Sequence, residues 1–587
     1  MDYQARTSDI HFILDKVLQA PVQLQGLQNY AEIESDLIQQ VLEESGKFVS
    51  EVVAPLNRVG DEVGAKYDSG RVTMPPGFRD AYQTFWQAGW PALACATEDG
   101  GQGLPAVLEA VLYEMLSGAN HGWTMAPGLL HGAYECIKHH ASRELKAQYL
   151  EKVATGEWLA TMCLTEPHAG SDLGLARTKA VVQTNGSYQI NGTKIFISGG
   201  EHDLSDNIVH LVLARLPDSP PGPKGLSLFL VPKFYSDGTR SSVVCERIEE
   251  KMGLHGSPTC VMRFDDATGW LVGEAGRGLN AMFVMMNAAR LHVALQGIGL
   301  LEAAWQKADA YAKERRQMRA PVRAPAQAGG RGKNAAEADF IIQHPAMRRI
   351  LDTQRAWIDG GRVLAYRTAI ELDMVKHHPD AERKKAAERW CSLVTPVLKS
   401  AWTAQAFGGG SECLQVFGGH GYVREWGIEQ NVRDARVAMI YEGTNEIQAI
   451  DLLVRKVLSD DGAGMAQLMS SLEKASEHYK NNSNIGNQYA GYMPKTLIKL
   501  TEELVLASRN NAELAFWVAD DYLRAVALTL MAWAWQQIES AVDSNKANST
   551  LDTARWQQPA EALRYFVLPE FDMRVQIIQA RLTQSKV

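Results

Sequence analysis

Apolar residues recur at helical spacing along most of this chain, with one long interruption. Apolar side chains three or four positions apart are typical of amphipathic helices that bury one face. The segments with this pattern are 36–42, 106–116, 280–318, 344–375, 381–407 and 496–542. The chain is therefore predicted to begin with helices and to end with a longer helical region.

The interruption, residues 161–280, is rich in β-branched residues and turn signals. Within 188–197, two short apolar runs flank Asn191-Gly192, a pattern that predicts a β-hairpin. Asn185-Gly186 supplies another turn just before it. This region is predicted to be a small antiparallel β domain.

The order of elements predicts an α+β fold. Helices, strands and helices follow one another in blocks and do not alternate, which argues against a doubly wound nucleotide-binding sheet. The predicted parts are an N-terminal helical domain, a middle β domain, a C-terminal helical bundle and an additional helical tail, at 1–160, 161–280, 281–455 and 456–587. A stretch rich in Ala, Pro, Gly and Arg, 320–335, is predicted to be a mobile surface loop.

Composition narrows the class of protein. The 587 residues are 46% hydrophobic and 22% charged, with a net charge of -9, which argues against nucleic-acid binding. The seven cysteines are scattered without a CxxC pair, so neither a disulfide framework nor a metal site is expected. The first residues lack a signal-peptide pattern, and the apolar run 525–535 is too short to span a bilayer. We expect a cytoplasmic protein without membrane insertion.

The stretch 441–448, Tyr-Glu-Gly-Thr-Asn-Glu-Ile-Gln, carries the clearest chemical signal. It places Glu442 directly before Gly-Thr and just after an apolar run. A carboxylate held among apolar neighbours and backbone amides can act as a base, because desolvation raises its pKa. Alone, the same residues also describe an exposed glutamate before a turn.

Four further stretches each allow a functional and a structural interpretation. A loop with hydroxyls can line a planar heterocycle or be a Pro/Gly turn, and a Phe beside a Ser can stack on a ring or fill a core. Paired arginines suit a pyrophosphate or a helix C-terminus, and glycines allow close approach of a cofactor or end a helix. The stretches are, in that order, 162–172, 194–200, 311–317 and 415–422.

Together these stretches resemble the acyl-CoA dehydrogenase family in both order and spacing, over about residues 80–455. The residues that carry the resemblance are 164–167, 170–172, 191–192, 253–259, Arg290, 311–317, 415–421, 433–435 and 441–448. The long N-terminal start, the insertion near 320–340 and the helical tail also resemble a larger bacterial subgroup, which includes 3-methylmercaptopropionyl-CoA dehydrogenases.

The resemblance implies an α-β-α core with bound FAD, in a homodimer or a dimer of dimers. It implies that a fatty acyl-CoA or 3-methylthiopropionyl-CoA is converted to a trans-2-enoyl-CoA, with Glu442 as the base and an electron-transfer flavoprotein as the electron acceptor. Two alternatives stay open on the sequence: an acyl-CoA oxidase that passes electrons to oxygen, and a non-catalytic acyl-CoA-binding protein.

The resemblance also assigns binding roles to residues. The cofactor-binding residues would be Leu164, Thr165, Ser171, Phe196, Ser198, Arg315, Gln317, Gln415, Gly419, Thr444 and Glu446. The substrate-binding residues would be Ser171, Arg290, Tyr441 and Gly443. Of the first set, the positions from Arg315 to Gly419 would reach the FAD of a neighbouring subunit.

Overall fold

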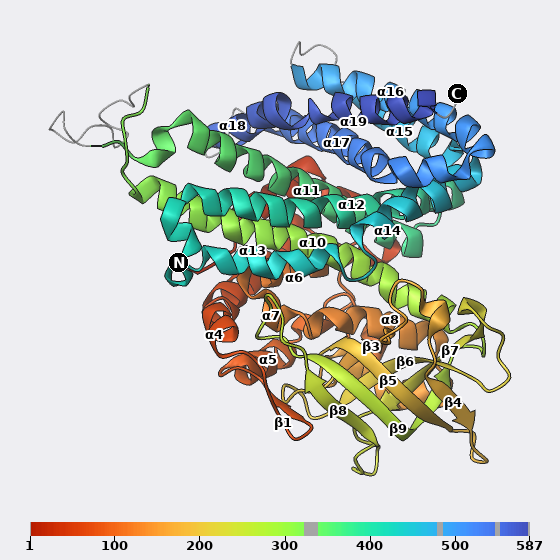
Figure 1. The fold of residues 1–587 in the computed structure, drawn as a ribbon. Helices are drawn as coiled ribbons and strands as arrows, with labels where there is room; N and C mark the ends of the chain where they lie inside the picture. Colours follow the sequence, from red (N-terminus) through yellow and green to blue (C-terminus); the bar gives the residue numbers. More distant parts are fainter. Residues whose placement is uncertain (1, 322–337, 478–484, 546–551, 585–587) are drawn as a thin grey trace. The chain divides into compact units, whose positions relative to one another are not determined.

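The computed structural model describes residues 2–321, 338–477, 485–545 and 552–584 (Figure 1). The chain divides into two compact units. The sheet unit consists of residues 2–5 and 44–292, and the helical unit consists of residues 6–43 and 293–587. Most of the predicted loop at 320–335 lies outside the described residues.

The sheet unit is built around one seven-stranded sheet. Its path runs β3-β6-β4-β5-β9-β7, with β8 paired to β9 and a further pairing between β6 and β7. The strands are β3 (Leu159–Cys163), β4 (Lys179–Val182), β5 (Tyr188–Ser198), β6 (Ile208–Arg215), β7 (Leu226–Pro232), β8 (Val243–Ile248) and β9 (Thr259–Val272). All seven residues of β7 are buried, whereas in β5 only Ile190, Lys194 and Ile197 are, so β5 is the more exposed of the two strands.

Most strand pairs are antiparallel, as predicted, but the sheet is mixed. Strand β3 runs parallel to β6, with Leu159 opposite Ile208. Parallel neighbours need a long connection, and the chain between β3 and β6 provides one that includes the β4–β5 hairpin.

The predicted hairpin at Asn191-Gly192 is wrong, because β5 runs through it as one strand. The Asn191 side chain donates to Asp266 Oδ1 (2.6 Å) and accepts from the Asp266 amide (2.9 Å), which ties it to β9. A register shift falls at this point of the β5–β9 pairing. The turn lies instead at Asn185-Gly186, which joins β4 to β5.

Helices make up the rest of the sheet unit, and α8 packs on β3. They are α4 (Leu56–Val63), α5 (Phe78–Gln87), α6 (Ala106–Ala119), α7 (His121–Thr124), α8 (Leu130–His140) and α9 (Arg143–Ala154), together with a small hairpin of β1 (Lys66–Asp68) and β2 (Arg71–Thr73). Thirteen residues of α6 are buried, Glu109 and Glu114 among them, so this helix is enclosed on all sides and central to its unit.

The helical unit is a bundle in which α11 packs on α12 and α17 packs on α16 and α19 (Figure 1). Its helices are α1 (Thr7–Phe12), α2 (Ala20–Gln25), α11 (Pro345–His377), α12 (Ala381–Val416), α13 (Ile428–Arg436), α14 (Asn445–Ile450), α15 (Ala463–Glu477), α16 (Ile485–Asn510), α17 (Ala512–Ser544), α18 (Ala554–Ala562) and α19 (Glu570–Gln584). The helix predicted over 496–542 is two helices, α16 and α17, which meet at Asn511. The unit boundaries fall inside α3 (Ser35–Phe48) and α10 (Gly278–Glu314).

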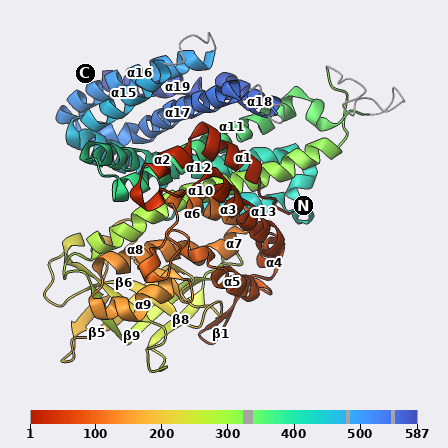
Figure 2. The same ribbon diagram turned by 180° about the vertical axis from the view of Figure 1, so that it is seen from behind.

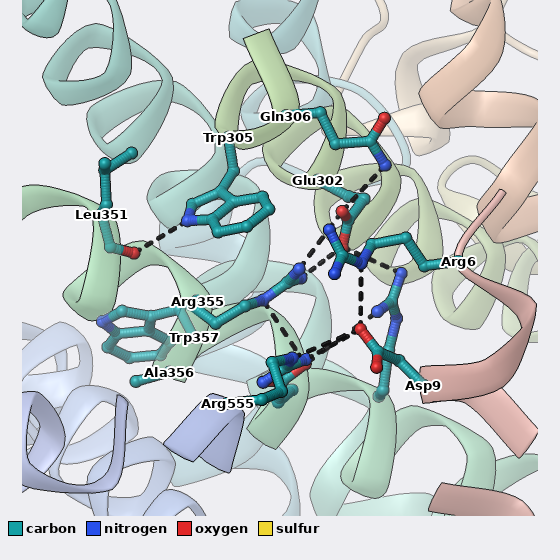
Figure 3. Close-up of polar contacts among 12 residues, drawn as sticks. Arg6, Asp9, Glu302, Trp305, Gln306, Leu351, Arg355, Ala356, Trp357 and Arg555 are labelled. Carbon is teal, nitrogen blue, oxygen red and sulfur yellow. Dashed lines mark hydrogen bonds and ion pairs between the residues drawn. The ribbon is translucent and has the colours of Figure 1, made fainter. Parts of the chain in front are cut away.

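A buried ion-pair network joins the two ends of the chain within the helical unit (Figure 3). Arg555 of α18 donates to Asp359 of α11 (2.7 Å) and to Asp9 of α1 (3.1 Å). Glu302 of α10 lies in the same network and pairs with Arg355. Burial alone would raise the pKa of Glu302, but the neighbouring arginines lower it far below its ordinary value. Seen from behind, the chain start lies along the bundle, and η1 (Ile13–Val17) packs on α11 and α17 (Figure 2).

Helix α10 is long and apolar enough to cross a membrane by length and composition alone. In the part of the chain that the structure describes, it is the one helix that meets both criteria. Its most apolar window is 65% buried, as in a core helix of a soluble protein, so this is weak support for a membrane span.

Candidate active site

The base loop, residues 440–444, lies between the short turn Val437–Met439 and helix α14. Glu442 has φ +54° and Gly443 has φ +85°. A left-handed backbone is easy for glycine but costs a residue with a side chain roughly 1–2 kcal/mol. The predicted base is therefore held in a strained conformation, which persists only where the surroundings enforce it.

Two buried side chains enforce it. Gln448 donates from Nε2 to the Glu442 carbonyl (3.0 Å), reaching back from α14. Lys399 of α12 donates from Nζ to the Gly443 carbonyl (2.7 Å) and to Asn445 Oδ1 (3.1 Å). Both Lys399 and Gln448 have no exposed surface. The sequence prediction gave neither residue a role.

The other predicted residues of this loop are placed by local contacts. Tyr441 donates from its hydroxyl to Gln296 Oε1 on α10, and burial raises the pKa of the phenol well above its ordinary value. Thr444 caps α14, because its hydroxyl accepts from the Ile447 amide (3.3 Å). Glu446 is exposed in the first turn of α14, where hydrogen bonds from its own amide and from Thr444 lower its pKa.

In the sheet unit, the structure brings two of the predicted cofactor stretches together. Leu164 and Thr165 follow β3, and the Thr165 carbonyl accepts from the Ile195 amide of β5 (2.9 Å). Lys194 Nζ also reaches the Leu164 carbonyl (3.1 Å). The loop after β3 thus runs directly beside Phe196.

Phe196 has the surroundings of a ring that meets a ligand. Its φ is +59°, at a register shift between β5 and β9, and 60% of its surface is exposed. The hydroxyls of Thr165, Ser171 and Ser198 form no hydrogen bond with any part of the chain that the structure describes. An exposed aromatic face beside free hydroxyls fits a planar heterocycle such as the isoalloxazine of FAD.

A buried ion pair, which the sequence prediction missed, anchors this loop. Glu166 accepts from Lys194 Nζ (2.8 Å) and from the amides of Arg177 (2.7 Å) and Thr178 (3.0 Å). Burial raises the pKa of Glu166, but Lys194 and the hydrogen bonds outweigh it and lower the pKa to about 2. The pair holds the loop after β3 against β5.

The two stretches predicted to reach a neighbouring subunit meet in the helical unit. The Tyr311 hydroxyl lies 2.8 Å from His420 Nδ1, and its ring stacks on Phe417 at 4.2 Å between centroids. The side chains predicted to bind, Arg315, Gln317 and Gln415, are exposed, and Gly419 is exposed with open space around it. The structural interpretation of 415–422 is confirmed, because α12 ends at Val416, and a cofactor contact at these glycines stays a prediction.

Arg290, predicted to bind substrate, lies half-buried on the part of α10 that belongs to the sheet unit. Within the described ranges, no group of three or more His, Cys, Asp or Glu side chains is placed to hold a metal ion.

Comparison with known proteins decides the family. Sequence models described as the N-terminal, middle and C-terminal domains of acyl-CoA dehydrogenase match residues 35–157, 161–267 and 331–457. The chain belongs to the acyl-CoA dehydrogenase family. As a member, it is an FAD-dependent oxidoreductase, and its helix-sheet-helix order is that of the family.

Two relatives show how far the likeness to this acyl-CoA dehydrogenase extends. The 3-methylmercaptopropionyl-CoA dehydrogenase of Ruegeria pomeroyi is 46% identical over 79% of this chain and 77% of its own length. The broad-specificity linear acyl-CoA dehydrogenase FadE5 of Mycobacterium tuberculosis is 35% identical over 83% of this chain and 80% of its own length.

Solved structures show the same fold. Butyryl-CoA dehydrogenase from Megasphaera elsdenii aligns with a TM-score of 0.58 and 24% identity over 72% of this chain and 98% of its own. An acyl-CoA dehydrogenase from Bacillus anthracis, solved with FAD, aligns with a TM-score of 0.71 and 21% identity over 96% of this chain and 90% of its own. The tail beyond residue 457 therefore has counterparts among larger structures of this fold.

Proposed function

We propose that this chain oxidises an acyl-CoA thioester between its α and β carbons to a trans-2-enoyl-CoA, with Glu442 as the base. The observation that carries the proposal is the strained base loop, in which Gln448 fixes the Glu442 carbonyl and Lys399 fixes the Gly443 carbonyl. Such strain is retained where it serves function, and a fixed carboxylate suits removal of a weakly acidic proton.

Each proposed role belongs to a named part of the chain. The Glu442 carboxylate takes the α proton, and its backbone amide donates a hydrogen bond to the thioester carbonyl, where negative charge develops. FAD, when bound, supplies the acceptor for the β hydrogen. Phe196 stacks on the flavin, and Thr165 and Ser198 offer hydroxyls to its edge.

The relatives suggest the substrate. We propose 3-methylthiopropionyl-CoA as the first candidate, because a relative 46% identical over most of this chain is named for that compound. Linear fatty acyl-CoAs are the second candidate, from the name of FadE5, and would place the enzyme in fatty-acid β-oxidation. Both substrates present the same thioester to Glu442 and differ in the chain beyond it.

The setting of the reaction is part of the proposal. The exposed Arg315, Gln317 and Gln415 side chains support a homodimer or a dimer of dimers in which they reach the FAD of a neighbour. An electron-transfer flavoprotein is the proposed acceptor of the electrons, and the cytoplasm is the proposed location.

The test is anaerobic mixing of the FAD-loaded protein with a panel of acyl-CoAs while the visible flavin band is followed. Wild-type protein should bleach with at least one of them. Glu442→Gln should keep its FAD and lose bleaching by about 10²–10⁴-fold, the usual contribution of a general base. Glu425→Gln, at an exposed turn position of the helical unit, is the matched control and should bleach normally.

The outcomes separate the alternatives. Full bleaching by Glu442→Gln would refute the assignment of the base. Peroxide formation in air at the rate of turnover would identify an oxidase. Tight binding of acyl-CoAs without bleaching by any of them would identify a binding protein.

A further inference from the structure

A polar groove of about 940 Å³ lies in the helical unit, and no residue of the base loop lines it. Its walls come from residues 15–23, from α11 and α12, and from α15 and α17. Residues 15–23, α15 and α17 lie outside the residues that the family models match. The groove is therefore formed where this chain extends beyond the shared domains, and its volume is within the range of small-molecule sites.

The charge of the groove is opposite to that of the protein. Four cations and two anions line it, which leaves two positive charges in a chain whose net charge is -9. These side chains are Lys16, Arg367, Arg383, Arg389, Asp15 and Glu371. A concave surface with excess positive charge attracts anions.

Of the four cations that line the groove, Arg389 is the one that pairs with no described residue. Lys16 forms an ion pair with Asp15 (2.7 Å), and Glu371 forms ion pairs with both Arg383 (2.5 Å) and Arg367 (3.6 Å). Arg389 is half-buried on α12 and makes no ion pair or hydrogen bond with the residues that the structure describes. A half-buried guanidinium in this state favours a carboxylate or phosphate ligand.

Other side chains that line the groove are either held in place by their neighbours or are hydrogen-bond donors without an acceptor among the described residues. The Arg367 guanidinium lies between two indole rings, 3.8 Å from the centre of Trp390 and 4.6 Å from that of Trp533. Within the described chain, Trp533 Nε1 and Gln537 Nε2 are buried donors without an acceptor. They lie one turn apart on α17, so a ligand oxygen beside this face could satisfy them after a small rotation of the Gln537 amide.

The rim of the groove is strained in the same way as the base loop. Gln19 has φ +50°, and Gln23 holds this turn by donating from Nε2 to the Leu18 carbonyl (2.6 Å). A left-handed backbone is strained for residues other than glycine, so the surroundings must stabilise it. Such residues cluster at ligand sites.

We propose that this groove binds a phosphate-bearing anion, with Arg389 as its main cation. The planar guanidinium of Arg389 can form two parallel hydrogen bonds with a phosphate group. The Arg367, Glu371 and Arg383 side chains, which pair with one another, limit where in the groove the phosphate can lie. The proposal is independent of the reaction at Glu442, because the two sets of residues do not overlap.

The test is calorimetric titration of the FAD-loaded protein with inorganic phosphate, pyrophosphate and ADP, each at several salt concentrations. Arg389→Gln should weaken binding at least tenfold and reduce its salt dependence. Lys499→Gln, an exposed cation on α16 outside the groove, is the matched control and should bind as wild type does. Flavin bleaching by acyl-CoA should be the same in all three proteins.

The three ligands identify the source of the phosphate. Equal binding of all three would show that a phosphate group alone is recognised, and binding of ADP alone would show that a nucleotide is. Absence of binding by all three at millimolar concentration would overturn the proposal. So would binding that Arg389→Gln leaves unchanged, since the ligand would then occupy another site.

Discussion

At the scale of single residues, the sequence pointed to Glu442 as the proposed base but not to the side chains that hold its loop. Glu442 is flagged by the residues around it, because a carboxylate before Gly-Thr after an apolar run is a local pattern. Lys399 lies 44 residues before the carbonyl that it holds, in the middle of a helix. A lysine in an amphipathic helix is normally read as solvent-exposed, so only the packing of α12 on α14 reveals this contact.

Replacing Lys399 by methionine tests its positioning role. Lys399→Met keeps the length of the side chain and removes the shorter of the two hydrogen bonds to the Gly443 carbonyl, which then keeps only Gln448 Nε2 at 3.4 Å. Loss of a hydrogen bond from a charged donor costs about 1.5–3 kcal/mol. We expect kcat to fall by roughly ten- to a hundredfold, with a small change in KM and with FAD retained, because base geometry and not affinity is lost. The measurement is steady-state dehydrogenation with an artificial electron acceptor.

The neighbouring Ser400→Ala is the control. The Ser400 backbone carbonyl accepts from Asn445 Nδ2 (3.1 Å), just after the base loop, and the substitution keeps that carbonyl. Its kcat should stay within about twofold of wild type. A Lys399→Met enzyme with wild-type kcat would show that Gln448 alone positions the base.

At the scale of elements, the sequence predicted the blocks correctly and misplaced a turn. Helical periodicity located α11 and α12 to within a few residues at their starts, because each is long and amphipathic. Asn-Gly is a strong local turn signal, yet at Asn191 the side chain bonds across to β9 and the strand continues. Such a pairing depends on a strand 75 residues away, which a local pattern cannot contain.

The Glu166–Lys194 ion pair, which anchors the loop after β3, makes the stability of the sheet unit depend on pH. The folded-state pKa of Glu166, about 2, lies below the ordinary 4.5, so the pair stabilises the fold above pH 4.5. This stabilisation should be lost as the pH falls from 4.5 towards 2. Thermal unfolding midpoints measured across this range should therefore drop steeply.

A double variant isolates that contribution. Glu166→Gln with Lys194→Met removes both charges, whereas Glu166→Gln alone would leave Lys194 buried without a counter-charge. The double variant should unfold near the wild-type temperature at neutral pH and show a shallower drop in acid. An identical acid profile would assign the pH dependence to other carboxylates, such as Glu302.

At the scale of the whole molecule, the tail is part of the fold and no mere appendage. Arg555 of α18 contacts Asp9 near the chain start and Asp359 in α11, so residues 546 positions apart share one carboxylate–guanidinium contact. The sequence predicted a helical tail but could not predict this closure, because single charged residues carry no information about distant partners.

Removing the Arg555 guanidinium should destabilise α1 and α18 together. Arg555→Met leaves Asp9 and Asp359 as buried charges without this partner and should destabilise the helical unit by about 3–5 kcal/mol. Hydrogen exchange should then accelerate in both α1 and α18. Arg509→Met, which breaks an exposed pair with Asp461, is the control and should change little. Faster exchange in α18 with α1 unchanged would contradict a shared network.

The left-handed backbone at Glu442 also bears on how this protein can evolve. Glycine, and to a lesser degree asparagine, would relieve the strain there, so selection for stability and selection for the reaction oppose each other at this position. A lineage that kept the fold but abandoned dehydrogenation would be free to drift to glycine at 442. The residue at that position in any descendant would thus record whether its ancestors were still under pressure to catalyse.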